Sequence, residues 1–587
     1  RGKRKAEGEP PKKRKWLVNS AITRELRSVV YYADPTEWNG PLLELIHRGE
    51  FVALHGPRAS GKSTRVLAVQ DQLRNEGFVC IYASFEHVQV EEDVHTFWQT
   101  LGMTLHRDAR ENGISISKIN SDQSFLEAFQ RDQWEQRNNV VLLFDEFDHM
   151  YTATEVVLNS CLKIIRGIKN SRNSFAIFSI VAIGPFSILY LNPNELTISP
   201  FNVQAPFQNP NFTREQVQTL YDEFMKEEQI TIDPKIIEDI YMQTNGHAGL
   251  VCLCGRAIYE KLMKELVGGV HLNHDTWQRF SAFLLGDEIT EYSTFRRMKN
   301  ALLRDNSKCA VKLFQSNFLA NIDPVRVSSD EKDLALFLAA EGVLVPGEET
   351  NTFKISSPLV RWLVLREIIP KVFPSSPKVE VPYRSSSHNL DIFEILKQAV
   401  CTFDREYMNL ASLRSFKRAY VNVNVNNVKN ESVPRESVYE AELYRILSNW
   451  LINFKITGQW HIVRHNNGRN QHKYSDLVID SPKHPTVVLE LLATAKRNEL
   501  DEHFSRVLIY ANELSAEEAW IVHFTCEDNV TENPYWPGDS ELKRGLRVVH
   551  FWHDINFTKI GVVACWWDAN GNAKHVTDVE EFMLRSI

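Results

Sequence analysis

Short unbroken apolar runs alternate with segments of helical periodicity along the first third of the chain. The apolar runs cover residues 51–54, 78–83, 140–144 and 175–183. Uninterrupted runs of this length are typical of parallel strands buried on both faces. The helical spacing of polar and apolar positions covers residues 17–29, 64–76, 94–102 and 124–136. This alternation predicts an α/β fold with a parallel sheet.

The segment after the first apolar run carries a phosphate-binding pattern. Residues 55–64 read HGPRASGKST and satisfy G-x-x-x-x-G-K-[ST]. Glycines let the backbone amides point at phosphate oxygens, Lys62 brings a positive charge, and Ser63 places a hydroxyl on Mg²⁺. The predicted contacts to ATP or GTP are Gly56, Pro57, Arg58, Ala59, Ser60, Gly61, Lys62, Ser63 and Thr64. The alternative is a glycine-containing surface turn that binds no ligand.

The third apolar run ends in acidic residues, as a magnesium–nucleotide site requires. Asp145 and Glu146 follow residues 140–144 directly, and Asp148 comes two residues later. We predict that Asp145, with Ser63, holds Mg²⁺ and that Glu146 orients and deprotonates the attacking water. Asp148 could support either role, and the alternative for all three is a solvated strand end.

This order of strand, phosphate loop and acidic strand resembles the signal-transduction and AAA-like ATPases. The resemblance implies an NTPase core over residues 17–205, a helical lid over 206–290 and a winged helix over 291–370. Residues 244–250, TNGHAGL, resemble the glycine-rich helix start that faces the nucleotide there. Sensor and arginine-finger roles stay unassigned among the candidates Ser179, Ser187, Arg256, Arg296, Arg361 and Arg366.

The last third of the chain has a second pattern, after a linker-like stretch over residues 371–434. From residue 435 to 587 the periodicities predict helix, three strands, helix and strand. Asp476 opens one apolar strand, and Glu490 lies inside another, where an uncompensated carboxylate costs several kcal/mol. On adjacent strands these two carboxylates would bind Mg²⁺ for phosphodiester cleavage, with Glu440 as a third catalytic carboxylate.

The strand and helix order resembles the restriction-endonuclease-like nucleases, whose motif is PD followed by D/E-x-K. The motif lysine is absent, because position 492 is leucine. Strand alternation places Lys496 on the face of Glu490, so Lys496 is the predicted substitute if the strand extends that far. His503 and Arg506 share a face of the next helix and could line the same cleft. The alternative is a buried ion pair in a fold that has lost activity.

Composition and charge restrict the setting of these two sites. The net charge of −8 argues against non-specific nucleic-acid binding by the whole chain. Residues 1–16 nevertheless contain two basic clusters, which predict either a bipartite nuclear-localisation signal or a solvated tail. The eight cysteines show no C-x-x-C spacing and indicate reduced thiols. No apolar segment predicts a membrane span, and the starting arginine leads us to expect a missing N-terminal segment.

The combination of an ATPase with this second domain resembles the Crinkler effectors of oomycetes and some fungi. Residues 437–443, SVYEAEL, and 490–495, ELLATA, carry the resemblance. It implies a secreted protein that reaches a host nucleus and damages DNA there, with DNA, the import machinery and a second copy of the chain as partners. The alternative is a signalling or scaffold NTPase that binds nucleic acid or a host protein and whose nuclease fold is inactive.

Overall fold

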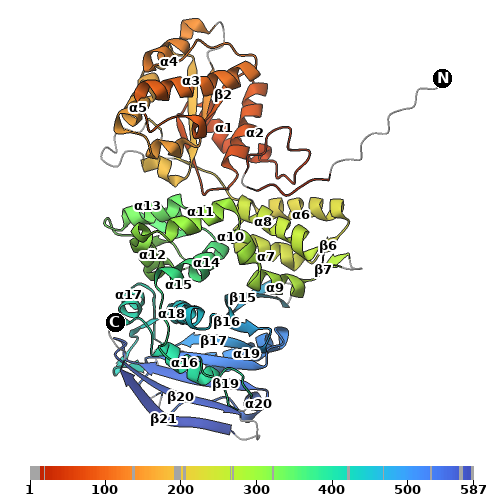
Figure 1. The fold of residues 1–587 in the computed structure, drawn as a ribbon, viewed down its shortest axis with the longest axis vertical. Coiled ribbons are helices and arrows are strands. Elements are labelled where there is room, and N and C mark those ends of the chain that lie inside the picture. The colour runs from red at the N-terminus through yellow and green to blue at the C-terminus, as the bar shows by residue number, and fades with distance from the viewer. Residues whose placement is uncertain are drawn as a thin grey trace, which may run out of the picture. The chain divides into compact units, whose positions relative to one another are not determined.

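A computed structural model describes residues 13–583 apart from residues 19, 135–138, 191–199, 202–205, 265, 267–269, 320, 322, 386, 420–422, 467–468, 529, 531 and 568–572. The chain forms two compact units, of which the first comprises Arg1–Leu272 with Leu336–Val345 (Figure 1). The second comprises Asn273–Ala335 with Pro346–Ile587. None of the described helices is long and apolar enough to cross a bilayer.

The first unit contains the predicted parallel sheet. Its strand order is β2-β3-β4-β1-β5, and all printed pairings are parallel. The strands are β1 (Val52–His55), β2 (Val79–Ser84), β3 (Val140–Asp145), β4 (Ile177–Gly184) and β5 (Phe207–Gln208). β3 is buried along its whole length, which explains its uninterrupted apolar sequence. The sheet order brings the carboxyl ends of β1 and β3 to one edge, where the predicted nucleotide residues lie.

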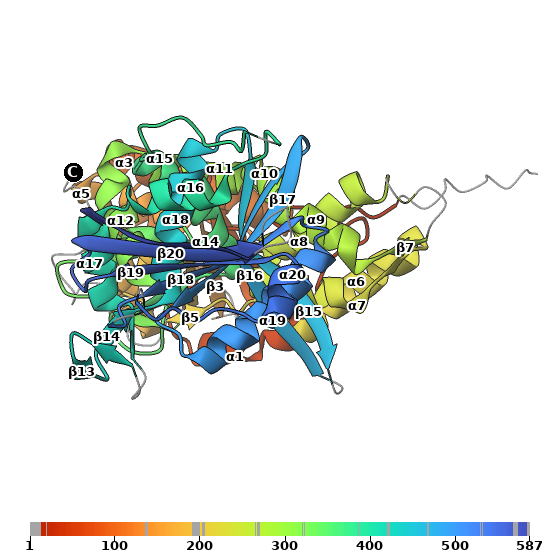
Figure 2. The ribbon, with the colours of Figure 1, turned by 90° about the horizontal axis from the view of Figure 1, so that it is seen from below.

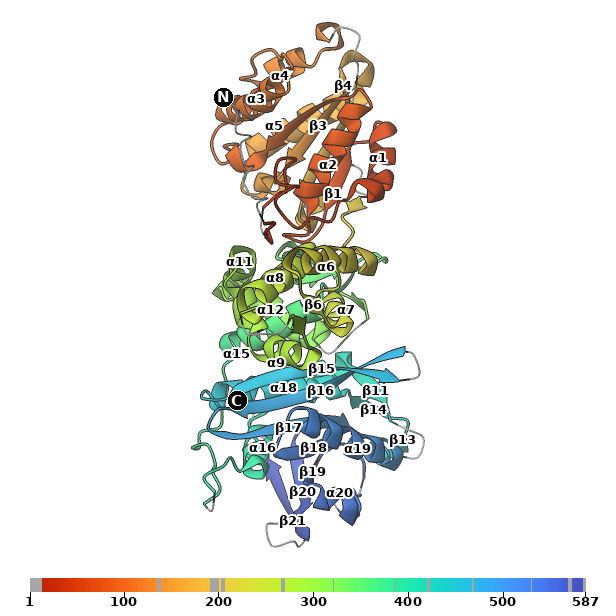
Figure 3. The same cartoon turned by 90° about the vertical axis from the view of Figure 1, so that its right-hand side faces the viewer.

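Helices cover both faces of this sheet. One face carries α1 (Gly40–His47) and α2 (Lys62–Asn75), whose apolar side chains pack with β1, β3 and β4. Figure 3 shows these two helices on the face opposite α3 (Val94–Glu111), α4 (Asp122–Ala128) and α5 (Glu155–Asn170). The helix predicted over residues 17–29 is wrong, because residues 24–29 form turns that lead into a bridge between Lys15 and Val30.

Three further helices complete the first unit. They are α6 (Arg214–Glu228), α7 (Pro234–Thr244) and α8 (Ala248–Ala257). α6 begins with a capping box, in which the Thr213 hydroxyl accepts from Gln216 N. These helices lie within residues 206–290, and the assignment of that range as a helical lid stays a prediction.

The second unit begins with small helices that precede and follow short strands. The elements are α9 (His274–Phe283), α10 (Leu285–Thr290), α11 (Ser293–Leu302), α12 (Lys308–Leu313), β8 (Val325–Arg326), β10 (Thr352–Ile355), α14 (Pro358–Leu363) and α15 (Ile369–Val372). β8 and β10 pair antiparallel. Two more elements within residues 291–370 are α13 (Lys332–Ala340) and β9 (Leu344–Pro346), of which Leu336–Val345 belongs to the first unit. The winged-helix assignment itself stays a prediction.

A seven-stranded sheet dominates the second unit. Its order is β15-β16-β17-β18-β19-β20-β21. The strands are β15 (Lys455–Asn466), β16 (Arg469–Ser481), β17 (His484–Ala493), β18 (Glu518–Thr525), β19 (Leu546–His553), β20 (Lys559–Trp567) and β21 (Ala573–Met583). Only β17-β18 and β18-β19 pair in parallel.

The helices of this sheet follow the predicted order. α18 (Glu436–Trp450) precedes β15, and α19 (Arg497–Glu513) connects β17 to β18. Figure 2 shows the sheet nearly edge-on, with α16 (Ile392–Val400) and α18 on one side and α19 and α20 (Asp539–Lys543) on the other.

Residues 371–434 differ from the predicted linker. They contain α16, α17 (Arg405–Arg414), and the short strands β11 (Phe416–Arg418), β12 (Asn424–Val425), β13 (Val428–Lys429) and β14 (Ser432–Pro434). They belong to the second compact unit. Arg384 donates through both terminal nitrogens to Glu518 at the start of β18, so the segment is attached to the sheet by a paired ion contact.

Candidate functional site

The phosphate loop joins β1 to α2 through a tight curl. Ala59 and Gly61 have positive φ values of 56° and 84°, and α2 begins at Lys62. Gly61 is the N-cap of α2 and provides no side-chain acceptor for the first helical N–H groups. A helix N-terminus without a cap of its own is suited to an anion, because its N–H groups and dipole favour negative charge. The backbone therefore fits a nucleotide phosphate.

Lys62 lies inside the curl of the loop. Its Nζ donates to the carbonyl oxygens of Gly56 at 3.1 Å and Pro57 at 2.7 Å. Burial lowers the pKa of Lys62 to about 8, and the nearby charges of Glu146 and Asp145 oppose that change. At neutral pH Lys62 is therefore protonated in most molecules, and it keeps the positive charge that binds a phosphate.

The acidic strand end faces the same loop. Asp145 accepts from the Tyr82 hydroxyl at 2.7 Å and from the Glu146 amide at 2.9 Å. Burial raises the pKa of Glu146, and the neighbouring carboxylates Asp145 and Asp148 raise it further. An ion pair of 3.1 Å joins Asp148 to Arg58 of the loop. Glu146 is thus a carboxylate of increased basicity, as general-base catalysis favours.

α8 packs directly on the phosphate loop, and its start lies within residues 244–250, whose predicted position facing the nucleotide stays a prediction. The His247 ring caps α8 through its contact with Leu250 N, and its Nε2 hydrogen-bonds to the Arg58 carbonyl at 3.0 Å. Gly249 N donates to the Ala59 carbonyl at 2.9 Å. A Cβ on Gly249 would lie 2.9 Å from Ala59 Cβ, so this close approach requires glycine.

Two site-adjacent residues were not predicted from the sequence. The first is Tyr82 on β2, whose contact to Asp145 is given above. The second is Asn209, which is buried, donates to the Ser60 carbonyl at 2.8 Å and accepts from Arg65 Nε at 2.7 Å. No sequence motif marks Asn209, because its partners lie about 150 residues earlier. Among the sensor candidates, buried Ser179 donates to the Glu50 carbonyl at 2.6 Å, which is a structural contact.

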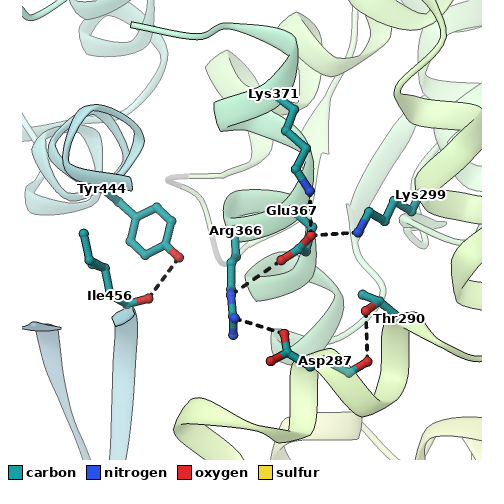
Figure 4. A network of polar contacts seen from close by, with 8 residues as sticks. All are labelled: Asp287, Thr290, Lys299, Arg366, Glu367, Lys371, Tyr444 and Ile456. Carbon is teal, nitrogen blue, oxygen red and sulfur yellow. Dashed lines mark hydrogen bonds and ion pairs between the residues drawn. The ribbon is translucent and has the colours of Figure 1, made fainter. Parts of the chain in front are cut away.

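The remaining predicted nucleotide residues and arginines have defined places. Ser63 lies in the first turn of α2, and the Thr64 hydroxyl accepts from Ile22 N at 3.1 Å. Arg256 pairs with Glu260 at 2.7 Å in the first unit. Arg296, Arg361 and Arg366 belong to the second unit. Figure 4 shows Arg366 beside Asp287 and Glu367, with a distance of 3.0 Å to Asp287.

The second candidate site lies on β16 and β17. These strands pair antiparallel with Leu477 opposite Leu489, so Asp476 and Glu490 follow as the next facing positions. Asp476 accepts from Leu491 N at 2.6 Å. The structure therefore brings the two predicted carboxylates onto adjacent strands.

Glu490 is fully buried and contacts an arginine and a histidine of α19. Its Oε1 accepts from Arg506 Nε at 2.9 Å and Nη2 at 2.5 Å, and contacts His503 Nδ1 at 3.0 Å. Its Oε2 is buried and has no hydrogen-bond partner within the described part of the chain. A buried carboxylate oxygen without a donor is costly, and a bound cation would satisfy it.

Two further carboxylates approach from α18. Glu440 was predicted, is buried, and lies 3.6 Å from Arg361 Nη2. Glu436 was not predicted, and burial followed by the charges of Glu490 and Glu440 raises its pKa to about 8. Burial and then Glu490, Glu436 and Glu440 raise the pKa of Asp476 well above its usual range. The repulsion among these neighbouring carboxylates therefore raises the pKa of both Glu436 and Asp476.

The condition for a substitute lysine at 496 is not met. β17 ends at Ala493, Thr494 has a φ of 38°, and Lys496 is the N-cap of α19. Lys496 N donates to Glu499 at 3.3 Å. Arg506 is the cation that the structure places on Glu490 instead. Across the described ranges, no three His, Cys, Asp or Glu side chains are arranged to hold a metal ion.

The sheet order of the first unit, its phosphate loop and its acidic strand end define a P-loop nucleotide hydrolase. Residues 21–266 match the family model described as "AAA-like domain". This part of the chain is therefore an AAA-like P-loop NTPase domain, and it implies a nucleotide cofactor, typically with Mg²⁺.

The chain is similar, at low sequence identity, to several solved structures. A Walker-type ATPase of Pyrococcus abyssi is 16% identical, with a TM-score of 0.40 over 60% of this chain and 99% of that chain. An ORC2 protein of Aeropyrum pernix in its ADP form is 13% identical, with a TM-score of 0.35 over 60% and 97%. The RuvB Holliday junction branch migration motor of Thermotoga maritima is 14% identical, with a TM-score of 0.29 over 53% and 89%. No curated protein matches the chain.

Proposed function

We propose that the chain is a nucleus-targeted effector-type protein in which nucleotide hydrolysis controls a Mg²⁺-dependent DNA endonuclease. The nuclease would be built on the seven-stranded sheet and would damage DNA in a host nucleus. The observation that carries this proposal is Glu490, a buried carboxylate with one partnerless oxygen beside Asp476, Glu436 and Glu440. A structural ion pair between Glu490 and Arg506 would not need three more carboxylates, whose repulsion opposes folding.

In the NTPase domain, side chains and backbone amides of the chain would bind the nucleotide and promote its hydrolysis. Lys62 and the first amides of α2 bind the phosphates, and Ser63 with Asp145 would hold Mg²⁺. Glu146 accepts a proton from the water that attacks the terminal phosphorus, while the bond to the bridging oxygen breaks. The raised pKa of Glu146 suits this role.

In the second site, Asp476 and Glu490 would hold Mg²⁺, which when bound activates water and stabilises the leaving oxygen. Water attacks phosphorus and loses a proton to solvent, the bond from phosphorus to the sugar oxygen breaks, and that oxygen takes one proton from Glu436, which solvent then reprotonates. Burial and the charges of Glu490 and Glu440 raise the pKa of Glu436, and a carboxyl group with a raised pKa is suited to donate to the leaving oxygen. Position 492, where the nuclease motif has a lysine, is leucine, and Arg506 would supply the missing positive charge.

The second candidate function is a signalling or scaffold NTPase with an inactive nuclease fold. Arg506 already pairs with Glu490 Oε1, His503 contacts the same oxygen, and this pairing favours a structural role. In that case the AAA-like domain would be the single active centre, and unit two would bind nucleic acid or a host protein.

Plasmid cleavage with Mg²⁺ separates the two candidates. We expect wild type to nick supercoiled plasmid, and Asp476→Asn with Glu490→Gln to lose at least about a hundredfold in rate, as expected when a metal ligand set is removed. Glu517→Gln is the matched control, because Glu517 is an exposed carboxylate just before β18. An intact plasmid with all three proteins, each confirmed to be folded, would refute the nuclease and leave the scaffold function.

Control by nucleotide needs a separate measurement. Lys62→Ala should abolish nucleotide hydrolysis and remove any effect of ATP on the rate of plasmid cleavage. If ATP changes the cleavage rate equally in wild type and Lys62→Ala, the proposed control by the NTPase domain is wrong even where the nuclease is active.

A further inference from the structure

The second basic cluster of the N-terminal segment is bound to the protein itself. Lys13 Nζ lies 2.8 Å from Glu228 on α6. Arg14 donates from its backbone N and from Nε to Glu227 at 2.6 and 2.5 Å, and its Nη1 contacts Glu223. The cluster is therefore held along one acidic face of α6, since residues 223 and 227 are one helical turn apart.

The backbone of this segment is fixed as well. Lys15 N donates to the Val29 carbonyl at 3.0 Å, and Tyr31 N donates to the Lys15 carbonyl at 3.1 Å. This parallel bridge between Lys15 and Val30 sets the chain in an extended form. The backbone N–H and C=O of Lys15 are thus already used inside the first unit.

Trp16 anchors the segment in an aromatic socket. Its ring lies 4.8 Å from that of Tyr31 and 5.3 Å from those of Tyr221 and Phe224, between ring centroids. Trp16 is only 7% exposed, and a Cβ on Gly255 of α8 would lie 2.4 Å from its ring. Burial of a tryptophan stabilises more than partly exposed ion pairs do, so Trp16 is the main anchor and the ion pairs set the register.

We propose that α6 and the Trp16 socket mask the basic segment from a nuclear import receptor. Receptors for basic signals must present negative charge to lysine and arginine side chains, and here Glu223 and Glu227 already occupy Arg14. Internal docking and receptor binding then compete for the same side chains. The proposal rests on the nuclear targeting in the proposed function, but its first test does not depend on import.

Trypsin cleavage after Arg14 in the full-length protein measures the docking directly. Glu223→Gln with Glu227→Gln should raise the cleavage rate about tenfold over wild type, and Gly255→Ala should raise it at least as much by displacing Trp16. Glu215→Gln with Asp222→Asn is the matched control, because it removes the same charge from exposed positions of α6. Equal cleavage rates in wild type, control and both test variants would overturn the proposal.

Binding to an import adaptor for basic signals tests the consequence. The adaptor should bind the Glu223→Gln and Glu227→Gln variant about tenfold more tightly than wild type and the control. Faster cleavage without tighter binding would overturn the masking of an import signal. Nucleotide hydrolysis, measured in parallel, shows whether each variant keeps the folded NTPase domain, and plasmid cleavage reports the proposed nuclease independently.

Discussion

Gly249→Ala tests the close approach of α8 to the phosphate loop. The new Cβ would lie 2.9 Å from both Ala59 Cβ and the Ala59 carbonyl oxygen, closer than real Cβ contacts. Overpacking of this kind costs about 1–3 kcal/mol, because backbone must shift to relieve it. The same substitution gains roughly 1 kcal/mol of helix propensity, so its net effect alone is ambiguous.

Gly167→Ala resolves the ambiguity as a matched control. Gly167 is an exposed glycine in α5, and a Cβ there meets nothing within 4 Å. It gains the helix propensity without the clash, so the two variants should differ by about 1–3 kcal/mol. For a domain of this size that corresponds to a difference of about 2–12 °C in Tm, with Gly249→Ala melting lower.

Nucleotide affinity provides the second readout. The clash falls on Ala59, inside the loop that binds phosphate, so Gly249→Ala should weaken binding of a fluorescent ATP analogue by about tenfold, or roughly 1.4 kcal/mol. Gly167→Ala should bind as wild type does. If both variants melt above wild type and bind nucleotide equally well, α8 does not pack closely on the phosphate loop.

Two further substitutions test ion and hydrogen-bond contacts. Burial alone would raise the pKa of Glu367, but Lys299 and Lys371 outweigh it and lower the pKa to about 2 (Figure 4). Because the pKa of Glu367 is depressed in the folded chain, ionised Glu367 stabilises the fold above about pH 4.5, and this stabilisation is lost as the pH falls toward 2. Glu367→Gln should therefore reduce the free energy of unfolding in urea by up to about 3 kcal/mol at pH 7. The difference from wild type should shrink at pH 3. An equal difference at both pH values would contradict this account. Tyr82→Phe should cost about 1–3 kcal/mol in urea unfolding and reduce Mg²⁺-dependent nucleotide hydrolysis, since it leaves a buried oxygen of Asp145 without its donor; unchanged hydrolysis would show that this contact does not orient Asp145.

Local sequence patterns were sufficient where all the parts of a site are neighbours in the chain. The phosphate loop and the start of α2 need only residues 55–64, because glycine conformations and a helix N-terminus create the anion site. The acidic end of β3 could be predicted for a similar reason. A strand buried on both faces is an unbroken apolar run in the sequence, and Asp145 and Glu146 mark its end.

Strand alternation predicted that Lys496 shares a face with Glu490, but it could not show where β17 ends. The turn at Thr494 removes Lys496 from the strand face, and Arg506 reaches Glu490 from α19. Which cation pairs with a buried carboxylate depends on how a helix packs on the sheet. The periodicity of the sequence does not predict the distance between a side chain of that helix and a side chain of the sheet.

Only the tertiary structure shows that the basic segment binds to the rest of the first unit. As a sequence, residues 13–16 are a charged run followed by one tryptophan, and the basic run predicts a nuclear-localisation signal or a solvated tail. Arg14 meets Glu227 across 213 residues, and Trp16 meets Gly255 on α8. The sequence determined the chemistry of each local site, whereas the folded chain determined which distant charges meet, because those contacts form only when the chain closes over hundreds of residues.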